Sequence, residues 1–199
     1  MIASDLHVAA LLEPAHLTTR AEALARSTPL PAQSGVYAWY FDVPPPGVPT
    51  EGVHASEFGH LLYVGIAPRE PRRRDSRPSK QDLRKRIRNH FRGNASGSTL
   101  RLTLGSLLAG ELGLQLRRVG NAERLTFGDG EAALSSWMAE HARVCWYVDP
   151  TPWAIESELL SEFVLPLNLD QNGHGRFHAT LSASRHAQRQ AARSLPVLP

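Results

Sequence analysis

Glu156 is the carboxylate in this sequence whose position most needs a chemical explanation. The residues from Trp153 to Leu165 are expected to form a helix that stops at Pro166. At about 100° per residue, four apolar residues fall within about 80° of Glu156, namely Leu159, Leu160, Phe163 and Val164. A carboxylate on an apolar face is costly unless it is paired or binds a metal. The pattern is equally consistent with a metal ligand and with a partner of a core arginine.

Arg86 and His90 are a second pair whose spacing could serve chemistry. Ser79 as an N-cap and Asp82 in the first turn predict a helix that ends near Gly93. Its apolar stripe consists of Leu83, Ile87 and Phe91. Residues four apart lie one turn apart on the same side of a helix. Arg86 and His90 are therefore expected together at the edge of the stripe, where a sheet would meet solvent.

The positive charge of the chain is concentrated around this helix. Between Ile66 and Arg92 there are eleven Lys or Arg and three Asp or Glu, a net charge of +8. The remaining residues, with eleven basic and sixteen acidic groups, carry −5. The run from Pro68 to Pro78, taken alone, is typical of a solvated loop. Because it continues into a basic helix, a phosphate-facing surface is the better interpretation.

The elements that must position these residues follow from hydrophobic patterning. Strands are expected at 35–41, 61–66 and 142–148, with weaker ones at 114–119 and 123–127. Helices are expected within 1–30 and at 79–93, 99–112, 131–141 and 153–165, with a further polar helix at 183–194. We therefore expect one domain over 1–199 with an α+β fold, in which helices flank a small, mostly antiparallel β-sheet.

Several classes of protein are disfavoured. No stretch is apolar enough for a membrane helix, and the N-terminus lacks the layout of a signal peptide, so a cytoplasmic protein is expected. Cys145, the single cysteine, lies in an apolar strand and is interpreted as core, which leaves oxygen and nitrogen as metal ligands. His174 and His178 are four apart, but Gly173 and Gly175 favour a polar loop over a metal-binding helix.

Four segments in order resemble the GIY-YIG nuclease superfamily. They are Gly35-Val36-Tyr37, Tyr63-Val64-Gly65, the Arg86/His90 helix at 83–91, and the Glu156 helix with its closing Pro166-Leu167-Asn168. Any one tripeptide occurs by chance in many chains, whereas the ordered set is specific. The resemblance covers 35–168, with longer connections at 42–60, 67–79 and 110–152 than the minimal domain has. It leaves an N-terminal helical extension at 1–34 and a C-terminal extension at 169–199.

The resemblance implies a metal-dependent endonuclease that hydrolyses DNA phosphodiester bonds. Glu156 would hold one Mg²⁺ or Mn²⁺, and Arg86 would bind the phosphate. Tyr63 would be the general base, provided that the nearby cation and Arg86 lower its pKa. Tyr37 would orient water or substrate, and His90 would hydrogen-bond Tyr63 or the phosphate. Supporting roles fall to Gly35 and Gly65 in the strands and to Asn168, which would tie the Glu helix to the sheet.

DNA is the expected partner. The residues assigned to its phosphates are Arg72, Arg73, Arg74, Lys80, Arg84, Lys85, Arg88, Arg92 and Arg101. The segment 92–101 is read equally well as a clamp on a DNA strand and as a flexible connection. Two rivals remain: a non-catalytic nucleic-acid-binding module on the same scaffold, which would not need Glu156, and an enzyme acting on small nucleotides, which the +8 surface disfavours. The oligomeric state is unknown from the sequence.

Overall fold

A three-stranded antiparallel sheet, in the order β2-β1-β5, lies at the centre of the protein. The structure is a computed structural model that describes residues 3–70 and 79–199. β1 (Gly35–Phe41) pairs with β2 (His60–Ala67) on one side and with β5 (Ala142–Val148) on the other. Every residue of β1 is buried. A central strand covered on both faces needs apolar side chains in both directions, which explains the run of aromatic and β-branched residues.

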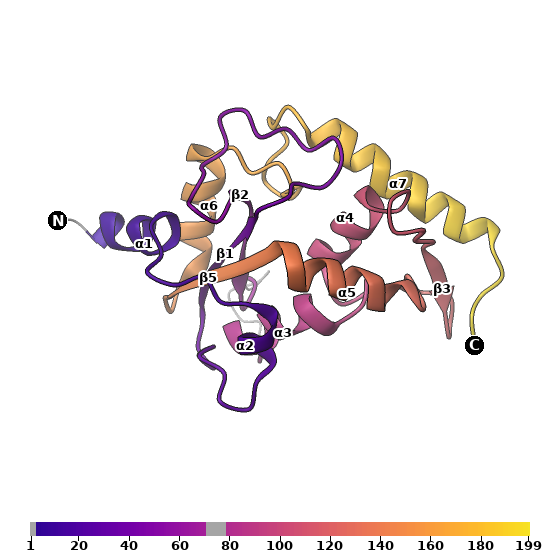
Figure 1. The fold of residues 1–199 in the computed structure, drawn as a ribbon, viewed down its shortest axis with the longest axis horizontal. Coiled ribbons are helices and arrows are strands. Elements are labelled where there is room, and N and C mark those ends of the chain that lie inside the picture. The colour runs from indigo at the N-terminus through magenta and orange to yellow at the C-terminus, as the bar shows by residue number, and fades with distance from the viewer. Residues whose placement is uncertain (1–2, 71–78) are drawn as a thin grey trace.

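Helices cover both faces of this sheet (Figure 1). They are α1 (Ala3–Leu12), α2 (Arg20–Leu24), α3 (Leu83–Arg92), α4 (Thr99–Leu107), α5 (Gly130–His141), α6 (Pro152–Glu162) and α7 (His178–Ser194). α1 packs on β5 and α6 packs on β2 and β1, while α3 and α5 contact the sheet from the opposite face. The alternation of side chains along β1 therefore divides the core into two layers.

The larger layer lies under α3, α4 and α5 and the smaller one under α1 and α6. From β1, the larger layer receives Tyr37, Trp39 and Phe41, and the smaller layer receives Val36, Ala38 and Tyr40. The side chain of Tyr37 thus shares a layer with α3, and Glu156 approaches from α6 on the other side. Tyr37 and Glu156 nevertheless line the same cavity, which lies beside β2 at one edge of the sheet.

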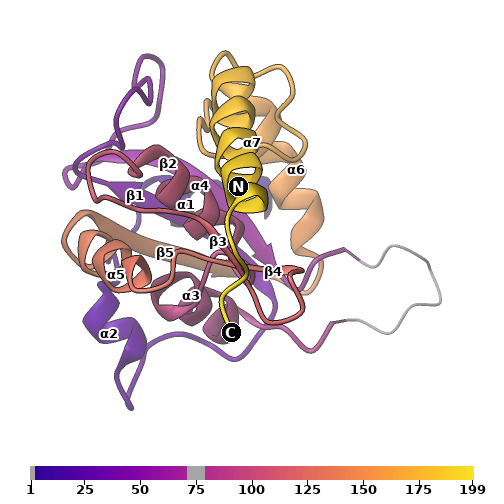
Figure 2. The same ribbon diagram turned by 90° about the vertical axis from the view of Figure 1, so that its right-hand side faces the viewer.

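α7 rests on α4 and leads to a small hairpin (Figure 2). The hairpin consists of β3 (Arg117–Val119) and β4 (Arg124–Thr126) and forms a sheet of its own. Leu198 bridges to Val119 of β3, and the guanidinium of Arg118 donates to three carbonyls at the end of α7, from Ala192, Arg193 and Leu195. These bonds fix the C-terminal helix against the rest of the protein.

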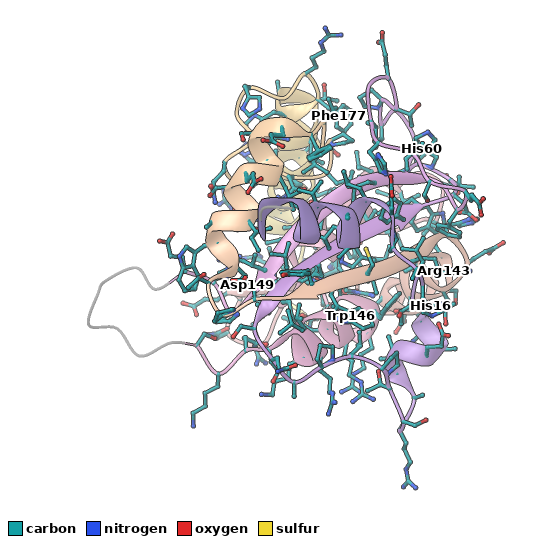
Figure 3. The ribbon with its side chains drawn as sticks, turned by 90° about the vertical axis from the view of Figure 1, so that its left-hand side faces the viewer. His16, His60, Arg143, Trp146, Asp149 and Phe177 are labelled. Atoms are coloured by element: carbon teal, nitrogen blue, oxygen red, sulfur yellow. The ribbon has the colours of Figure 1, made fainter. Side chains whose placement is uncertain are left out.

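The outer edge of β5 is partly covered by the N-terminal segment. Thr18 and Val144 exchange backbone hydrogen bonds of 2.8 and 3.1 Å. Figure 3 views this side of the protein, with Arg143 and Trp146 along β5 and Asp149 just after it. The guanidinium of Arg143 lies 4.7 Å from the ring centroid of Phe58, a cation–π contact. Pairing of this kind protects an exposed strand edge from other chains.

The α+β fold expected from the sequence is confirmed, with differences at element ends. Ser79 is not the N-cap of α3: the side chain of Asp82 accepts the Lys85 N–H and takes that place. The helix expected at 99–112 ends at Leu107, and the polar helix expected from Ala183 begins earlier, at His178. Within the described residues, no helix combines the length and apolar character needed to cross a membrane.

Candidate active site

One cavity of about 210 Å³ brings together four of the five residues expected to be catalytic. Tyr37 comes from β1, Tyr63 from β2, Arg86 from α3 and Glu156 from α6. This cavity, called the main cavity because it holds the candidate catalytic residues, lies beside β2, one of the two edge strands of the sheet. Four separate elements thus direct two phenols, a guanidinium and a carboxylate into one water-accessible space.

Arg86 is held in place by bonds on both sides. Its Nε donates to the hydroxyl of Tyr37 at 3.3 Å and its Nη1 donates to the carbonyl of Gly97 at 3.0 Å. Asn89 also donates to that carbonyl, at 2.6 Å. An arginine has five N–H groups, so these two bonds leave donors available to an anion in the cavity. A guanidinium oriented in this way is suited to bind a phosphate.

His90 lies behind Tyr37 and does not reach the cavity. It is fully buried, with its Nε2 2.8 Å from the Tyr37 hydroxyl and its Nδ1 2.6 Å from the hydroxyl of Ser98. Burial holds the pKa of His90 well below its ordinary value, with the charges of Arg86 and Arg101 adding to the effect. His90 is therefore neutral, with one donor and one acceptor nitrogen.

These bonds correct the expected role of His90. The hydroxyl of Tyr37 accepts from Arg86, so its proton is best placed on the bond to His90 Nε2; His90 then donates from Nδ1 to Ser98. The sequence predicted a bond to Tyr63 or to phosphate. The hydroxyl of Tyr63 instead lies 3.2 Å from that of Thr99. His90 is thus a positioning residue for Tyr37 and, through it, for Arg86.

The two tyrosines titrate above the ordinary range. Tyr63 is 8% exposed, and burial raises its pKa, although the hydrogen bond from Thr99 and the charge of Arg86 act in the opposite direction. Burial also raises the pKa of Tyr37, and the charge of Tyr63 raises it further. The lowered pKa expected for Tyr63 is therefore not produced by the described residues of the protein, and both hydroxyls are protonated at neutral pH.

Glu156 is partly buried in the wall of the main cavity. Burial raises the pKa of its carboxyl from 4.5 to about 7; the charges of Arg69 and Arg86 lower it, and that of Asp170 raises it. Among residues 3–70 and 79–199 the carboxylate has no hydrogen bond and no ion pair, so the expected alternative of a core arginine partner is not found there.

Glu156 is suited to hold a divalent cation that keeps most of its water ligands, rather than one bound by several protein side chains. Within the described residues no group of three or more His, Cys, Asp or Glu side chains could hold a metal. Mg²⁺ commonly takes one or two carboxylates and keeps several waters. Among the described residues this partly buried carboxylate has arginines nearby but forms no ion pair with them, and it faces a cavity large enough for water, so it fits such a site.

Gly35, Gly65 and Asn168 shape the surroundings of the main cavity. A Cβ on Gly65 would lie 2.5 Å from the hydroxyl oxygen of Tyr37, and one on Gly35 would meet the carbonyl of Tyr147. The side chain of Asn168 accepts from the Val64 N–H at 3.0 Å and donates to the Val64 carbonyl at 2.9 Å. Asn168 thus ties the turn after α6 to β2.

The basic residues assigned to DNA divide into different groups. Arg72, Arg73 and Arg74 lie outside the described residues. Lys80, Lys85 and Arg92 are exposed, with Lys85 paired to Asp82 at 2.7 Å. Arg84 donates to the Leu30 carbonyl, and Arg88 donates to the carbonyls of Ala23, Leu24 and Ala25. These last two guanidinium groups hold the N-terminal segment against α3, contrary to the DNA contacts expected for them.

The assignment of Arg101 to DNA is wrong. Its side chain is 0% exposed and forms a 2.6 Å ion pair with Glu131, with further bonds to the carbonyls of His90 and Glu131. Such a guanidinium is a structural crosslink between α3, α4 and α5. The segment 92–101 is anchored to α3 through hydrogen bonds at Gly97 and Ser98. These bonds argue against the interpretation of this segment as a flexible connection.

Five residues at the site were not assigned individual roles from the sequence. They are Ser98 and Thr99, within the segment 92–101, and three arginines at the cavities, Arg69, Arg185 and Arg189. A signal for Arg185 was present. On α7 it lies four residues after the buried Leu181 and seven before the buried Ala192, so it falls on the buried side of the helix. This is the same anomaly that singled out Glu156.

Comparison with known families agrees with the geometry. The family model of the GIY-YIG catalytic domain matches residues 35–187, which is more than half of the chain and continues past Asn168 into α7. The protein belongs to this family. The family is one of nucleases, so membership assigns nuclease activity in the broad sense and a nucleic acid as substrate. Searches among curated proteins and among solved structures found no match.

Proposed function

We propose that the protein is a metal-dependent endonuclease that hydrolyses DNA phosphodiester bonds in the main cavity. The observation that carries the proposal is the convergence of Tyr63, Arg86 and Glu156, from three separate elements, on that cavity. Family membership supports the nuclease class. DNA as the nucleic acid, the metal and the roles of the individual residues are inferred from the chemistry that these side chains can perform.

Arg86 binds the scissile phosphate in this proposal. Its remaining N–H groups neutralise the charge that grows on the nonbridging oxygens as water attacks phosphorus. Its bonds to Tyr37 and Gly97 keep it in this orientation before substrate arrives, which lowers the cost of reorganisation in the transition state. Tyr37 acts here by positioning, with His90 and Ser98 behind it.

Tyr63 accepts a proton from the attacking water, and the bond from phosphorus to the 3′-oxygen breaks. As a base it must first lose its own proton, and burial makes this loss harder. Thr99 and Arg86 favour the phenolate. Because only the phenolate can act as the base, the active fraction of the enzyme increases with pH. The carboxylate of Glu156 would hold Mg²⁺ or Mn²⁺, which when bound supplies positive charge for the phosphate and the leaving oxygen.

Incubation of purified protein with supercoiled plasmid and with DNA and RNA oligonucleotides, in Mg²⁺, Mn²⁺ or EDTA, tests the proposal. We expect nicking or linearisation of plasmid with either metal and none in EDTA. Tyr63→Phe, Arg86→Gln and Glu156→Gln should each abolish cleavage while the circular dichroism spectrum stays unchanged. Binding of DNA without cleavage under every condition would instead support the non-catalytic module, and cleavage of RNA alone would refute the choice of DNA.

Binding of the metal has a readout that is independent of cleavage. Mn²⁺ should raise the melting temperature of the wild-type protein and leave that of Glu156→Gln unchanged, because a ligand stabilises only the state that binds it. An equal rise in both proteins would place the cation elsewhere.

A further inference from the structure

A second cavity, of about 190 Å³, adjoins the main cavity. Four residues line both spaces, namely Arg69, Arg86, Thr99 and Arg185. The far wall of the second space is formed by residues 95–97, which precede α4, and by Arg189 of α7. We call it the arginine cavity. A DNA strand with one phosphate bound at Arg86 in the main cavity can therefore continue directly into the arginine cavity.

The two cavities differ in charge. The described residues that line the main cavity include the acidic side chains of Glu70, Glu156 and Asp170 beside its arginines. The arginine cavity is lined by four arginines, Arg69, Arg86, Arg185 and Arg189, and its described lining includes no acidic residue. A cation is accordingly favoured in the first space and an anion in the second.

Arg185 is the residue in this cluster that most needs an anion. Its Nε is inaccessible to water and has no hydrogen-bond partner in the structure, although burying an unpaired donor of a charged group is costly. Burial lowers the pKa of Arg185, and the neighbouring charge of Arg189 lowers it further; Asp170 and Tyr63 act in the opposite direction. No ion pair joins Arg185 to an acid in the described ranges.

The helix that carries Arg185 is firmly anchored. Ser184 donates to the Ser106 carbonyl of α4 at 3.3 Å, Leu181 is fully buried, and Arg118 fixes the last turn. Arg185 and Arg189 are four apart and lie one turn from each other on α7. Two like charges held this close repel one another, and a phosphate between them would remove that cost.

We propose that the arginine cavity binds the backbone phosphate adjoining the scissile one, through Arg185 and Arg189 of α7 together with Arg69. This proposal rests on the proposed function, since it takes the phosphate at Arg86 as the scissile one. The C-terminal helix then sets the path of the strand: one phosphate sits beside Glu156 and the next sits in the arginine cavity. Phosphate contacts carry no base information, so this subsite acts on strands of any sequence.

Binding measurements on an inactive background separate this proposal from the proposed function. Affinity of Glu156→Gln for fluorescein-labelled single-stranded and duplex oligonucleotides is measured without metal over a range of NaCl concentrations. Adding Arg185→Gln should weaken binding at least about tenfold and reduce the slope of log affinity against log salt by about 0.7 to 0.9, the value of one phosphate contact. These readings do not require cleavage, so they remain informative if the protein cuts nothing.

Arg189→Gln is a second variant at the same cavity, and it should act in the same direction. Arg189 is exposed, so we expect this variant to fold normally. Arg193→Gln, exposed near the end of the same helix and outside both cavities, is the matched control for loss of one positive charge. An equal change in slope for Arg185→Gln, Arg189→Gln and Arg193→Gln would reduce the effect to general charge and overturn the proposal.

Neutral linkages locate the contact on the strand. We consider an oligonucleotide in which a methylphosphonate replaces the phosphate next to the scissile one. This replacement should weaken binding to Glu156→Gln, in which Arg185 is intact, about tenfold. The same substitution should have no further effect on Arg185→Gln, because the partner of that phosphate is already gone. Additive losses at that linkage would show that Arg185 and the adjoining phosphate are not in contact, and the proposal would fail.

Discussion

Replacement of Glu156 by glutamine should stabilise the protein while abolishing cleavage. The carboxyl has its pKa raised from 4.5 to about 7, mainly by burial. The native protein thus keeps this proton to higher pH than the unfolded chain does. Its free energy of unfolding should fall as pH rises from about 4.5 to about 7 and stay lower above that range.

The size of the effect follows from the same values. Each pH unit between the two pKa values, 4.5 and about 7, contributes about 1.4 kcal/mol, which gives an upper limit of about 3.5 kcal/mol. Water reaches this partly buried group, so a destabilisation of about 2 to 3 kcal/mol is expected. Glutamine cannot ionise. The variant should therefore be more stable than the wild-type protein by that amount at pH 8 without metal, and equal to it at pH 4.

Urea unfolding at pH 4, 6 and 8, with EDTA or with Mn²⁺, measures these differences. The matched control is Glu162→Gln, which removes an exposed carboxylate from the same helix. In Mn²⁺ at pH 8 the difference in stability between the variant and the wild-type protein should narrow or change sign, because the cation binds only the wild-type protein. A glutamine variant that is less stable than wild type at pH 8 in EDTA would show that the carboxylate already has a cationic partner.

Three further substitutions separate chemistry from support. Tyr63→Phe should lower the cleavage rate by at least about 100-fold, with an unchanged Kd for DNA. The rate of the wild-type protein should increase with pH above neutrality, as the raised pKa of Tyr63 requires. A rate that does not change with pH would exclude Tyr63 as the base. Ser98→Ala removes the acceptor for His90 and the N-cap of α4, and should cost about 1 to 3 kcal/mol in urea; full stability would contradict the hydrogen-bond chain. Glu131→Gln leaves buried Arg101 without its ion pair and should cost about 3 to 5 kcal/mol without changing the salt slope of DNA binding, so a changed slope would return Arg101 to the DNA surface.

The sequence predicted the parts of the site that depend on period and order. Glu156 and Arg86 were found because helical spacing fixes which side of a helix a residue occupies, and the strand signal at Tyr37 and Tyr63 is strong. The partners of side chains could not be read in this way. Arg84, Arg88 and Arg101 have the same local pattern as surface arginines, yet their bonds go to segments 11 to 65 residues away in the chain.

The pKa of Tyr63 shows a second limit. The sequence indicated that Arg86 is close, and it is, but not that the sheet and α4 would bury the phenol more effectively than one charge can offset. Thr99 and Ser98 were likewise missed as individual contributors, because a hydroxyl in a small polar segment has no periodic signature. Their roles depend on the way the start of α4 is folded back onto α3.

The bonds between α3 and the N-terminal segment have a consequence for engineering. Arg84 and Arg88 donate to the carbonyls of residues 23–25 and 30, and Arg20 donates to the carbonyl of Phe91. The helix that presents Arg86 is thereby braced from behind by a stretch that borders neither cavity. A fusion of this protein to a separate DNA-targeting domain should therefore begin no later than Thr19. A fusion that begins at Gly35 would remove the N-terminal segment whose hydrogen bonds support α3.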